Sequence, residues 1–184
     1  HSNKVNIASE LSSNGNAKGD SIVSNKKNQG LWIYSADCIP ILFADRKTGR
    51  VAACHAGWRG LEKGIIRNTI NMFAKLGSNR INIIVALGPA ISGANYSLKL
   101  PILKAICKSI KSYQELKEEE LEAIIKVSNS IDFIEKKKGL DGFAIDLRTI
   151  ALIQLLDEGI KKDSISINKL CTFSESKLLH SWRR

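Results

Sequence analysis

Apolar residues gather in short blocks along the chain, and two neighbouring blocks predict a pair of strands. Ile39–Ala44 and Arg50–His55 are compact and largely apolar, and the polar stretch between them carries Gly49. Two apolar runs around a short polar connection that contains glycine are typical of a β-hairpin. We therefore expect two antiparallel strands here.

The pattern changes from strand to helix after His55. Residues 56–60 read Ala-Gly-Trp-Arg-Gly, which is too rich in glycine for a strand. From Leu61 the apolar positions recur at helical spacing until Gly77. This spacing, with a glycine at its end, predicts a helix over Leu61–Leu76.

The rest of the chain continues to alternate between strand-like and helix-like segments. Further strands are predicted at Leu31–Ala36, Ile81–Leu87, Phe143–Asp146 and Ile165–Leu170, and further helices at Pro101–Tyr113, Glu115–Val127 and Leu147–Glu158. Because the hairpin argues against an all-parallel sheet, we expect an α+β fold with mixed sheets. The stretch from Asn3 to Gly30 is rich in Asn, Ser, Gly and Lys, so we expect it to contain a long mobile loop.

Two reactive side chains stand at the open end of the predicted hairpin. Cys38 precedes the first strand and His55 closes the second. In an antiparallel pair joined by a short loop these positions are neighbours, so the thiol and the imidazole come within reach of each other. Adjacent side chains on a strand point to opposite faces, which assigns Cys54 to the core.

The glycine-rich turn that follows is a candidate anion site. Gly57 and Gly60 flank Arg59 just before the predicted helix. Such a turn exposes backbone N–H groups at a helix N-terminus, and a guanidinium can bind phosphate or carboxylate through two hydrogen bonds. The alternative is that the glycines only form the turn and that Arg59 is a solvated surface charge.

These motifs carry a resemblance to a known family. Ala-Asp-Cys-Ile-Pro at residues 36–40, followed by His-Ala-Gly-Trp-Arg-Gly at 55–60, resembles the laccase-domain family, also called multicopper polyphenol oxidoreductases. The likeness covers nearly the whole chain, continuing through residues 87–91, 146–148, 171–172 and 181–184. The family is associated with purine nucleoside phosphorylase activity and with peptidoglycan editing in bacteria. The resemblance implies stacked mixed β-sheets flanked by helices, in a single domain.

The resemblance also implies a metal site. The family has an upstream Gln-Val-His motif, and the opening residues 1–5, His-Ser-Asn-Lys-Val, look like that motif cut at its histidine. The implied metal ligands are His1, Cys38 and His55; the alternative is that His1 is a tag remnant or a disordered end. We expect residues 1–184 to be one laccase-domain-like catalytic domain that lacks N-terminal residues of the full protein.

The donor set favours zinc over copper. Two imidazoles and one thiolate without a fourth protein ligand are typical of a catalytic zinc site. The four cysteines are far apart, which excludes a zinc ribbon or finger. A copper electron-transfer site needs a weak axial ligand, and the only methionine, Met72, falls in a predicted helix. Without a metal, Cys38 and His55 could instead form the nucleophilic dyad of a Cys–His hydrolase.

The remaining polar residues near these motifs have several readings. His180 is expected to pack rather than to bind metal, and Asp146 to cap the helix that follows it. Asp37 could orient a ligand or a substrate hydroxyl, or act as a structural cap. Arg183 and Arg184 could face substrate or simply end in solvent.

The composition of the chain limits the number of domains, the cellular location and the class of partner that we expect. The chain has 184 residues, 43% of them hydrophobic, which suits one domain with a substantial core. No apolar run approaches the roughly 18 residues needed to cross a bilayer, and four separate cysteines favour a reducing compartment, so we expect a cytoplasmic protein. The net charge of +10 raises the alternative of a nucleic-acid-binding module, but the lysines are scattered and aromatic residues make up only 6%.

The function that these features favour is zinc-dependent phosphorolysis of purine nucleosides: adenosine, inosine and methylthioadenosine. Zinc would activate water or polarise a substrate hydroxyl, while Arg59 and the turn amides hold phosphate for attack at the anomeric carbon of the ribose. Adenosine deaminase activity is a further expectation. The leading alternative is a metal-dependent hydrolase that edits peptidoglycan precursors, followed by the Cys–His hydrolase, a copper polyphenol oxidase and the nucleic-acid-binding module.

Overall fold

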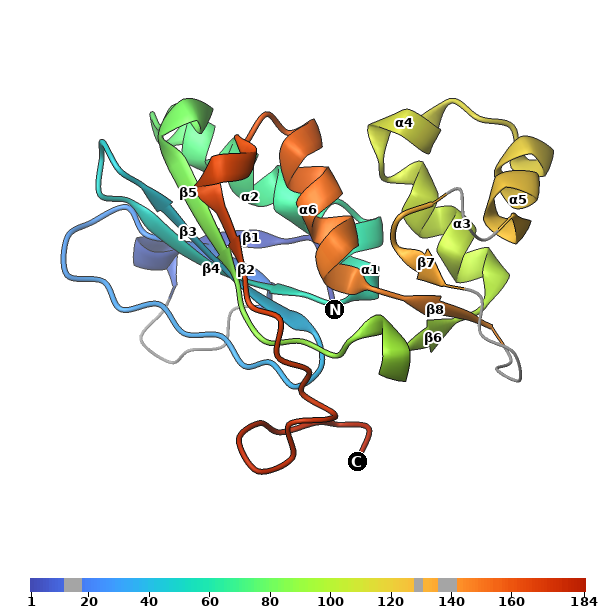
Figure 1. Cartoon of the computed structure of the whole chain (residues 1–184). Coiled ribbons are helices and arrows are strands. Elements are labelled where there is room, and N and C mark those ends of the chain that lie inside the picture. The colour runs from blue at the N-terminus through green and yellow to red at the C-terminus, as the bar shows by residue number, and fades with distance from the viewer. Residues whose placement is uncertain (12–17, 128–130, 136–141) are drawn as a thin grey trace.

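The computed structural model of the chain describes residues 1–11, 18–127, 131–135 and 142–184. Its main element is a six-stranded sheet in the order β1-β2-β4-β3-β5-β9 (Figure 1). The strands are β1 (Val5–Ile7), β2 (Ser21–Val23), β3 (Ile39–Asp45), β4 (Val51–Ala56), β5 (Ile83–Leu87) and β9 (Ile165–Ile167). The outer pairs β1/β2 and β5/β9 are parallel and the inner pairs are antiparallel, so the sheet is mixed.

Helices cover one face of this sheet and surround a smaller second sheet. The helices are α1 (Trp58–Glu62), α2 (Ile65–Lys75), α3 (Leu100–Lys108), α4 (Lys111–Gln114), α5 (Glu118–Lys126) and α6 (Leu147–Asp157). Helix α2 packs on β2 and β4, with α6 beside it, whereas α3, α4 and α5 gather near the small sheet (Figure 1). That sheet runs β6-β8-β7, with strands β6 (Ser97–Leu98), β7 (Ile134–Glu135) and β8 (Phe143–Ile145). The expected mixed α+β fold with flanking helices is confirmed.

One hydrophobic core joins the two sheets to their helices. Phe43 of β3 meets Phe73 of α2, with ring centroids 6.2 Å apart. Both side chains are buried, and the same cluster continues through α3 and α6 into β8. Across the described residues, every helix is too short or too polar to span a lipid bilayer.

The predicted hairpin is confirmed, and the helix after it begins earlier and is broken. Strands β3 and β4 pair antiparallel, with Pro40 opposite His55. The predicted helix Leu61–Leu76 is two helices, α1 and α2, because Gly64 takes a left-handed conformation with φ of 75°. The segment Pro101–Tyr113 is likewise divided, between α3 and α4.

The predicted strand Leu31–Ala36 is wrong, and the short strands β1, β2, β6 and β7 were not predicted. Trp32 and Tyr34 are 88% and 96% exposed and the segment pairs with no strand, so it lacks the half-buried surface that makes such residues favour a strand. The stretch Asn3 to Gly30, expected as a loop, contains β1 and β2, which at three residues each are too short to show a period. Residues 12–17 of that expected loop lie outside the described residues.

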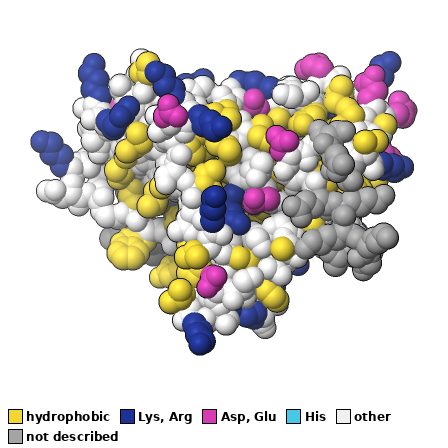
Figure 2. All heavy atoms as spheres, viewed as in Figure 1, with side chains coloured by type: hydrophobic (Ala, Val, Ile, Leu, Met, Phe, Trp, Pro, Cys, Tyr) yellow, Lys and Arg dark blue, Asp and Glu magenta, His cyan; other side chains and the backbone are white. Residues whose placement is uncertain are grey.

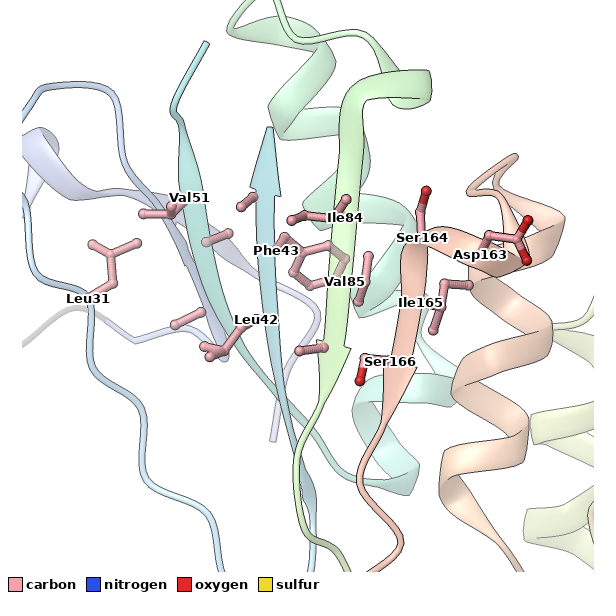
Figure 3. Close-up of a pocket in the computed structure, with 14 residues that line it drawn as sticks. Leu31, Leu42, Phe43, Val51, Ile84, Val85, Asp163, Ser164, Ile165 and Ser166 are labelled. Carbon is pink, nitrogen blue, oxygen red and sulfur yellow. The ribbon is translucent and has the colours of Figure 1, made fainter. Parts of the chain in front are cut away.

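The face of the large sheet that points away from α2 and α6 is apolar and open. Leu42, Val51 and Ile84 line a hollow of about 580 Å³ on this face. Figure 3 shows these side chains on the neighbouring strands β3, β4 and β5. Their strand neighbours point into the core instead, as the alternating burial along β3 and β5 shows. The hollow is separate from the side chains described next.

Candidate metal centre

The hairpin brings Cys38 and His55 together as expected. Cys38 lies directly before β3, and His55 is the penultimate residue of β4, opposite Pro40. Cys54 points to the other face, is fully buried, and its burial raises the pKa of its thiol to about 12. The alternation of side chains along β4 therefore separates a core cysteine from the histidine of the site.

A third donor joins this pair from the segment before β1. One ligand atom each from His1, Cys38 and His55 lie within 4.8 Å of one another. Cys38 Sγ is 3.8 Å from His1 Nε2, and the two imidazole centroids are 5.0 Å apart. In the described part of the chain, no other cluster of His, Cys, Asp and Glu side chains meets this criterion.

The spacing fits a transition-metal ion. In a tetrahedral zinc site, zinc–sulfur and zinc–nitrogen bonds of about 2.3 and 2.0–2.1 Å set sulfur and nitrogen about 3.6 Å apart. The separation of 3.8 Å in this structure needs little adjustment to reach that value. A donor set of one thiolate and two imidazoles suits zinc and also copper, so the three side chains could hold either metal ion.

The thiol of Cys38 lies where its neutral form is favoured. Burial raises the pKa of Cys38, and the nearby carboxylates of Asp37 and Asp20 raise it further. An uncompensated thiolate is therefore disfavoured here, whereas a bound cation would offset both effects.

Gly57 makes room for the three donors. A Cβ atom at this position would lie 2.7 Å from Cys38 Sγ and 3.0 Å from His1 Cδ2. Gly57 also precedes the first residue of α1. Gly60 has a different environment, because it is buried within α1 and a Cβ there would press on Ile65.

Arg59 is exposed on the first turn of α1. Its guanidinium lies 4.2 Å from the centroid of the Trp58 ring. None of the carboxylates in the described ranges forms an ion pair with it. The guanidinium is thus oriented by an aromatic surface and available to an anion.

The C-terminal segment adds a second arginine that the sequence had left undecided. The Arg183 guanidinium lies 4.6 Å from the centroid of the Tyr96 ring. Burial raises the pKa of Tyr96 to about 12. The charges of Arg183, Cys38 and Arg59 also affect this pKa, so these groups lie in the same region of the protein. Tyr96 was not predicted, because only the tertiary fold brings it to the centre.

Asp37 ties the C-terminal segment to the turn that carries Cys38. Its carboxylate accepts hydrogen bonds from Thr172 Oγ1 at 2.6 Å and from the Arg183 backbone N–H at 3.2 Å. The residue is buried and has φ of 83°, a left-handed conformation that is costly for a side chain larger than glycine. These contacts match the structural-cap reading of Asp37.

Asp20 was also missed as a site residue. Its Oδ1 lies 3.2 Å from His55 Nδ1, and its Oδ2 accepts a hydrogen bond from the Ser2 backbone N–H. Burial alone would raise the pKa of Asp20, but these hydrogen bonds lower it below its ordinary value. The signal in the sequence was the short Gly19-Asp20-Ser21 segment, which leads into β2. This segment alone does not indicate which residue Asp20 contacts.

Two of the other predictions concern residues outside the centre. Asp146 caps α6, with its carboxylate accepting a hydrogen bond from the Arg148 backbone N–H at 3.0 Å, as predicted. His180 does not belong to the cluster of donor side chains, but the expectation that it packs is wrong, because its side chain is exposed.

The chain matches one family along its full length. The model of the family described as multi-copper polyphenol oxidoreductase laccase covers residues 1–184. A purine nucleoside phosphorylase of Synechocystis is 36% identical over 170 residues, covering 90% of this chain and 62% of that protein. The purine nucleoside phosphorylase YlmD of Bacillus subtilis is 31% identical over 166 residues, covering 90% and 53%.

A solved structure with the same fold supports this match. The crystal structure of a Neisseria meningitidis protein superposes with a TM-score of 0.77 at 29% identity, covering 100% of this chain and 66% of that one. The chain thus spans between half and two thirds of the length of these relatives.

Proposed function

Because the chain belongs to the multi-copper polyphenol oxidoreductase laccase family, we propose that it is part of a metal-dependent purine nucleoside phosphorylase. Relatives from Synechocystis and Bacillus subtilis are named purine nucleoside phosphorylases. The observation that carries the proposal is the convergence of His1, Cys38 and His55, which come from three separate segments. We also propose that residues 1–184 act as a single catalytic domain, because one core joins both sheets.

We propose zinc as the metal, held by the two imidazoles and the thiolate. When bound, zinc would supply a Lewis acid that polarises an oxygen atom of the substrate or of water. The protein provides the open coordination position that this chemistry needs, because only three donor side chains converge among the described residues. The remaining steps rest on the side chains around the centre.

Arg59 is the proposed phosphate-binding group. Its guanidinium can hold two phosphate oxygens at once, and the ring of Trp58 limits the directions in which it can point. Gly57 lets the side chains of Cys38 and His1 pack directly against the start of the helix that carries Arg59, which brings the donors and the guanidinium into one region. In this arrangement an oxygen of monohydrogen phosphate attacks the anomeric carbon and the glycosidic C–N bond breaks. The leaving purine nitrogen takes up the proton that the phosphate gives up, and ribose 1-phosphate is the second product.

Adenosine, inosine and methylthioadenosine are the proposed substrates, with adenosine deaminase activity as a side reaction. Phosphorolysis and deamination differ in the atom attacked, because the first breaks the bond to the sugar and the second replaces the amino group of the base. Added phosphate therefore distinguishes the two reactions.

A Cys–His hydrolase is the second candidate, and one contact favours it. His55 Nδ1 faces the Asp20 carboxylate, as the histidine of a Cys–His–Asp arrangement would. The elevated pKa of Cys38 counts against it, because a nucleophilic cysteine needs a stabilised thiolate. Activity without any metal would favour this candidate.

The test is to incubate the full protein with adenosine, with and without inorganic phosphate, and to separate the products by chromatography. We expect adenine and ribose 1-phosphate only when phosphate is present. The Cys38→Ser variant should lose this activity, and His180→Ala, which removes an exposed histidine outside the centre, should keep it. If inosine were the sole product, the activity on adenosine would be deamination and not phosphorolysis. The protein is also incubated with a peptidoglycan precursor that carries a misplaced serine on its muramic acid. Release of that serine, with no turnover of nucleosides, would overturn the proposal in favour of peptidoglycan editing.

A further inference from the structure

We propose that Asp20 is the positioning residue of the metal centre, and that its single carboxylate orients both histidine donors. The inference rests on the proposed metal-dependent function. Asp20 stands directly before β2, and β2 lies between β1 and β4 in the sheet. His1 precedes β1 and His55 lies on β4, so Asp20 is placed between the two histidine-bearing segments.

One oxygen of the carboxylate acts on His55. Asp20 Oδ1 is 3.2 Å from His55 Nδ1, a distance at which a protonated Nδ1 donates a hydrogen bond. A neutral imidazole carries one proton, so a proton held on Nδ1 leaves the Nε2 lone pair for a metal ion. A carboxylate in this position therefore fixes both the tautomer and the ring plane of a histidine ligand.

The other oxygen acts on the segment of His1. Asp20 Oδ2 accepts a hydrogen bond from the backbone N–H of Ser2, the residue next to His1. This contact holds the backbone from which the His1 imidazole reaches Cys38 Sγ, 3.8 Å away. The two oxygens thus act on two different ligand-bearing segments.

The backbone of Asp20 fixes the carboxylate in place. The carbonyl oxygen of Asp20 accepts a hydrogen bond from the His55 N–H at 2.7 Å, and the Asp20 N–H donates to the Lys4 carbonyl oxygen at 3.2 Å. The Asp20 side chain is 19% exposed and the His55 side chain 17% exposed, so little water competes for their contact. The main-chain bonds hold the backbone of Asp20 between the two histidine segments, and the contacts of its two oxygens with His55 Nδ1 and the Ser2 N–H hold the carboxylate.

Asp20 acts through the ligands rather than as one of them. The cluster of donor atoms within 4.8 Å of one another contains His1, Cys38 and His55 and does not extend to Asp20 among the described residues. A contact of this kind typically changes metal affinity by roughly 10- to 100-fold when it is removed.

The test compares zinc affinity in the full protein and in three variants by competition with a chelator. Asp20→Asn removes the charge at nearly constant size, Asp20→Glu keeps the charge, and Asp163→Asn is the control, because it removes an exposed carboxylate outside the centre. We expect Asp20→Asn to bind zinc roughly 10- to 100-fold more weakly, Asp20→Glu to lose less, and Asp163→Asn to match the wild type.

Nitrogen-15 NMR of the imidazoles gives a second readout that a merely structural role would not move. We expect His55 in the wild-type protein to carry its proton on Nδ1, with or without zinc, and this preference to be lost in Asp20→Asn. Equal zinc affinity in wild type and Asp20→Asn, or a wild-type His55 protonated on Nε2, would overturn the inference while leaving the metal function intact. Wild-type protein that binds no zinc would overturn the proposed metal-dependent function. In that case the tautomer of His55, measured by NMR, would still test whether Asp20 orients that ring.

Discussion

At the residue scale, Gly57 determines whether the donor side chains can meet. We expect Gly57→Ala to lower zinc affinity by at least tenfold, because its Cβ would lie 2.7 Å from Cys38 Sγ and the thiol must move. Gly30→Ala is the matched control, since its Cβ would approach nothing closer than 3.8 Å. Chelator competition measures the effect, and wild-type zinc affinity in Gly57→Ala would show that the site tolerates the displacement.

Arg59 is the second residue at which we expect a single substitution to affect function, because its side chain is the proposed phosphate-binding group. Replacing it by alanine should weaken the use of phosphate by at least tenfold in kcat/KM while zinc stays bound, because a two-point hydrogen bond to a charged group is lost. Arg59→Lys should restore little, since an ammonium cannot reproduce the planar fork. Arg46→Ala, in the exposed turn of the hairpin, is the control. Unchanged phosphate dependence in Arg59→Ala would return this residue to the surface-charge reading.

At the element scale, the β3–β4 hairpin carries two of the three proposed ligands, and its turn is held by Asp45. Burial alone would raise the pKa of Asp45, but the nearby Ser78 hydroxyl and the hydrogen bonds from Lys47 and Thr48 lower it to about 2. The Lys47 and Thr48 backbone N–H groups donate to Asp45 Oδ1 at 2.8 and 3.2 Å. The turn is therefore stabilised by the ionised form of this carboxylate.

This lowered pKa predicts how stability depends on pH. The contribution of Asp45 is fully present above its unfolded pKa near 3.8 and is lost as pH falls toward about 2. Asp45→Asn should reduce the free energy of unfolding by about 1–3 kcal/mol at neutral pH and flatten its fall between pH 4 and 2. Urea denaturation across this range checks both, with Asp163→Asn as the control. An unchanged acid profile in Asp45→Asn would contradict this role.

Elements with a strong local signal were predicted well, and those defined by their partners were not. Two compact apolar runs on either side of the polar stretch with Gly49 were enough to place β3 and β4, and Gly77 was enough to end α2. The strands β1 and β2 depend on pairing with each other and with β4, which a three-residue stretch does not reveal. Leu31–Ala36 has the composition of a strand but lacks a neighbouring strand to pair with.

The same distinction holds for the candidate centre. The approach of Cys38 to His55 follows from the hairpin alone, whereas the placement of His1 was available only from the family resemblance. Asp20 contacts His55, and Tyr96 contacts Arg183, across large distances in the sequence, and such tertiary contacts follow no periodic pattern along the chain.

At the scale of the whole molecule, the chain carries a net charge of +10. On the face shown in Figure 2, lysine and arginine side chains are separated by polar and apolar ones and form no continuous stripe. The Lys136–Lys138 run lies outside the described residues. A scattered positive surface suits the attraction of anionic substrates better than the tracking of a nucleic-acid backbone.

Affinity for DNA should accordingly be weak and should depend little on salt. Fluorescence anisotropy with a labelled duplex, measured at about 50 and 200 mM salt, is the check, because a protein with 6–10 phosphate contacts loses about 10³- to 10⁵-fold in affinity over that range. Tight binding with such a steep loss would favour the nucleic-acid-binding alternative.

The central claim is that His1, Cys38 and His55 hold one metal ion that the reaction requires, and elemental analysis tests it most directly. We expect about one zinc ion per chain in the purified wild-type protein and in His180→Ala, and little zinc in Cys38→Ser or His55→Ala, because a three-ligand site tolerates little loss. Removal of zinc by a chelator should abolish phosphate-dependent release of adenine, and added zinc should restore it. Full activity in protein shown to be free of metal would contradict the account.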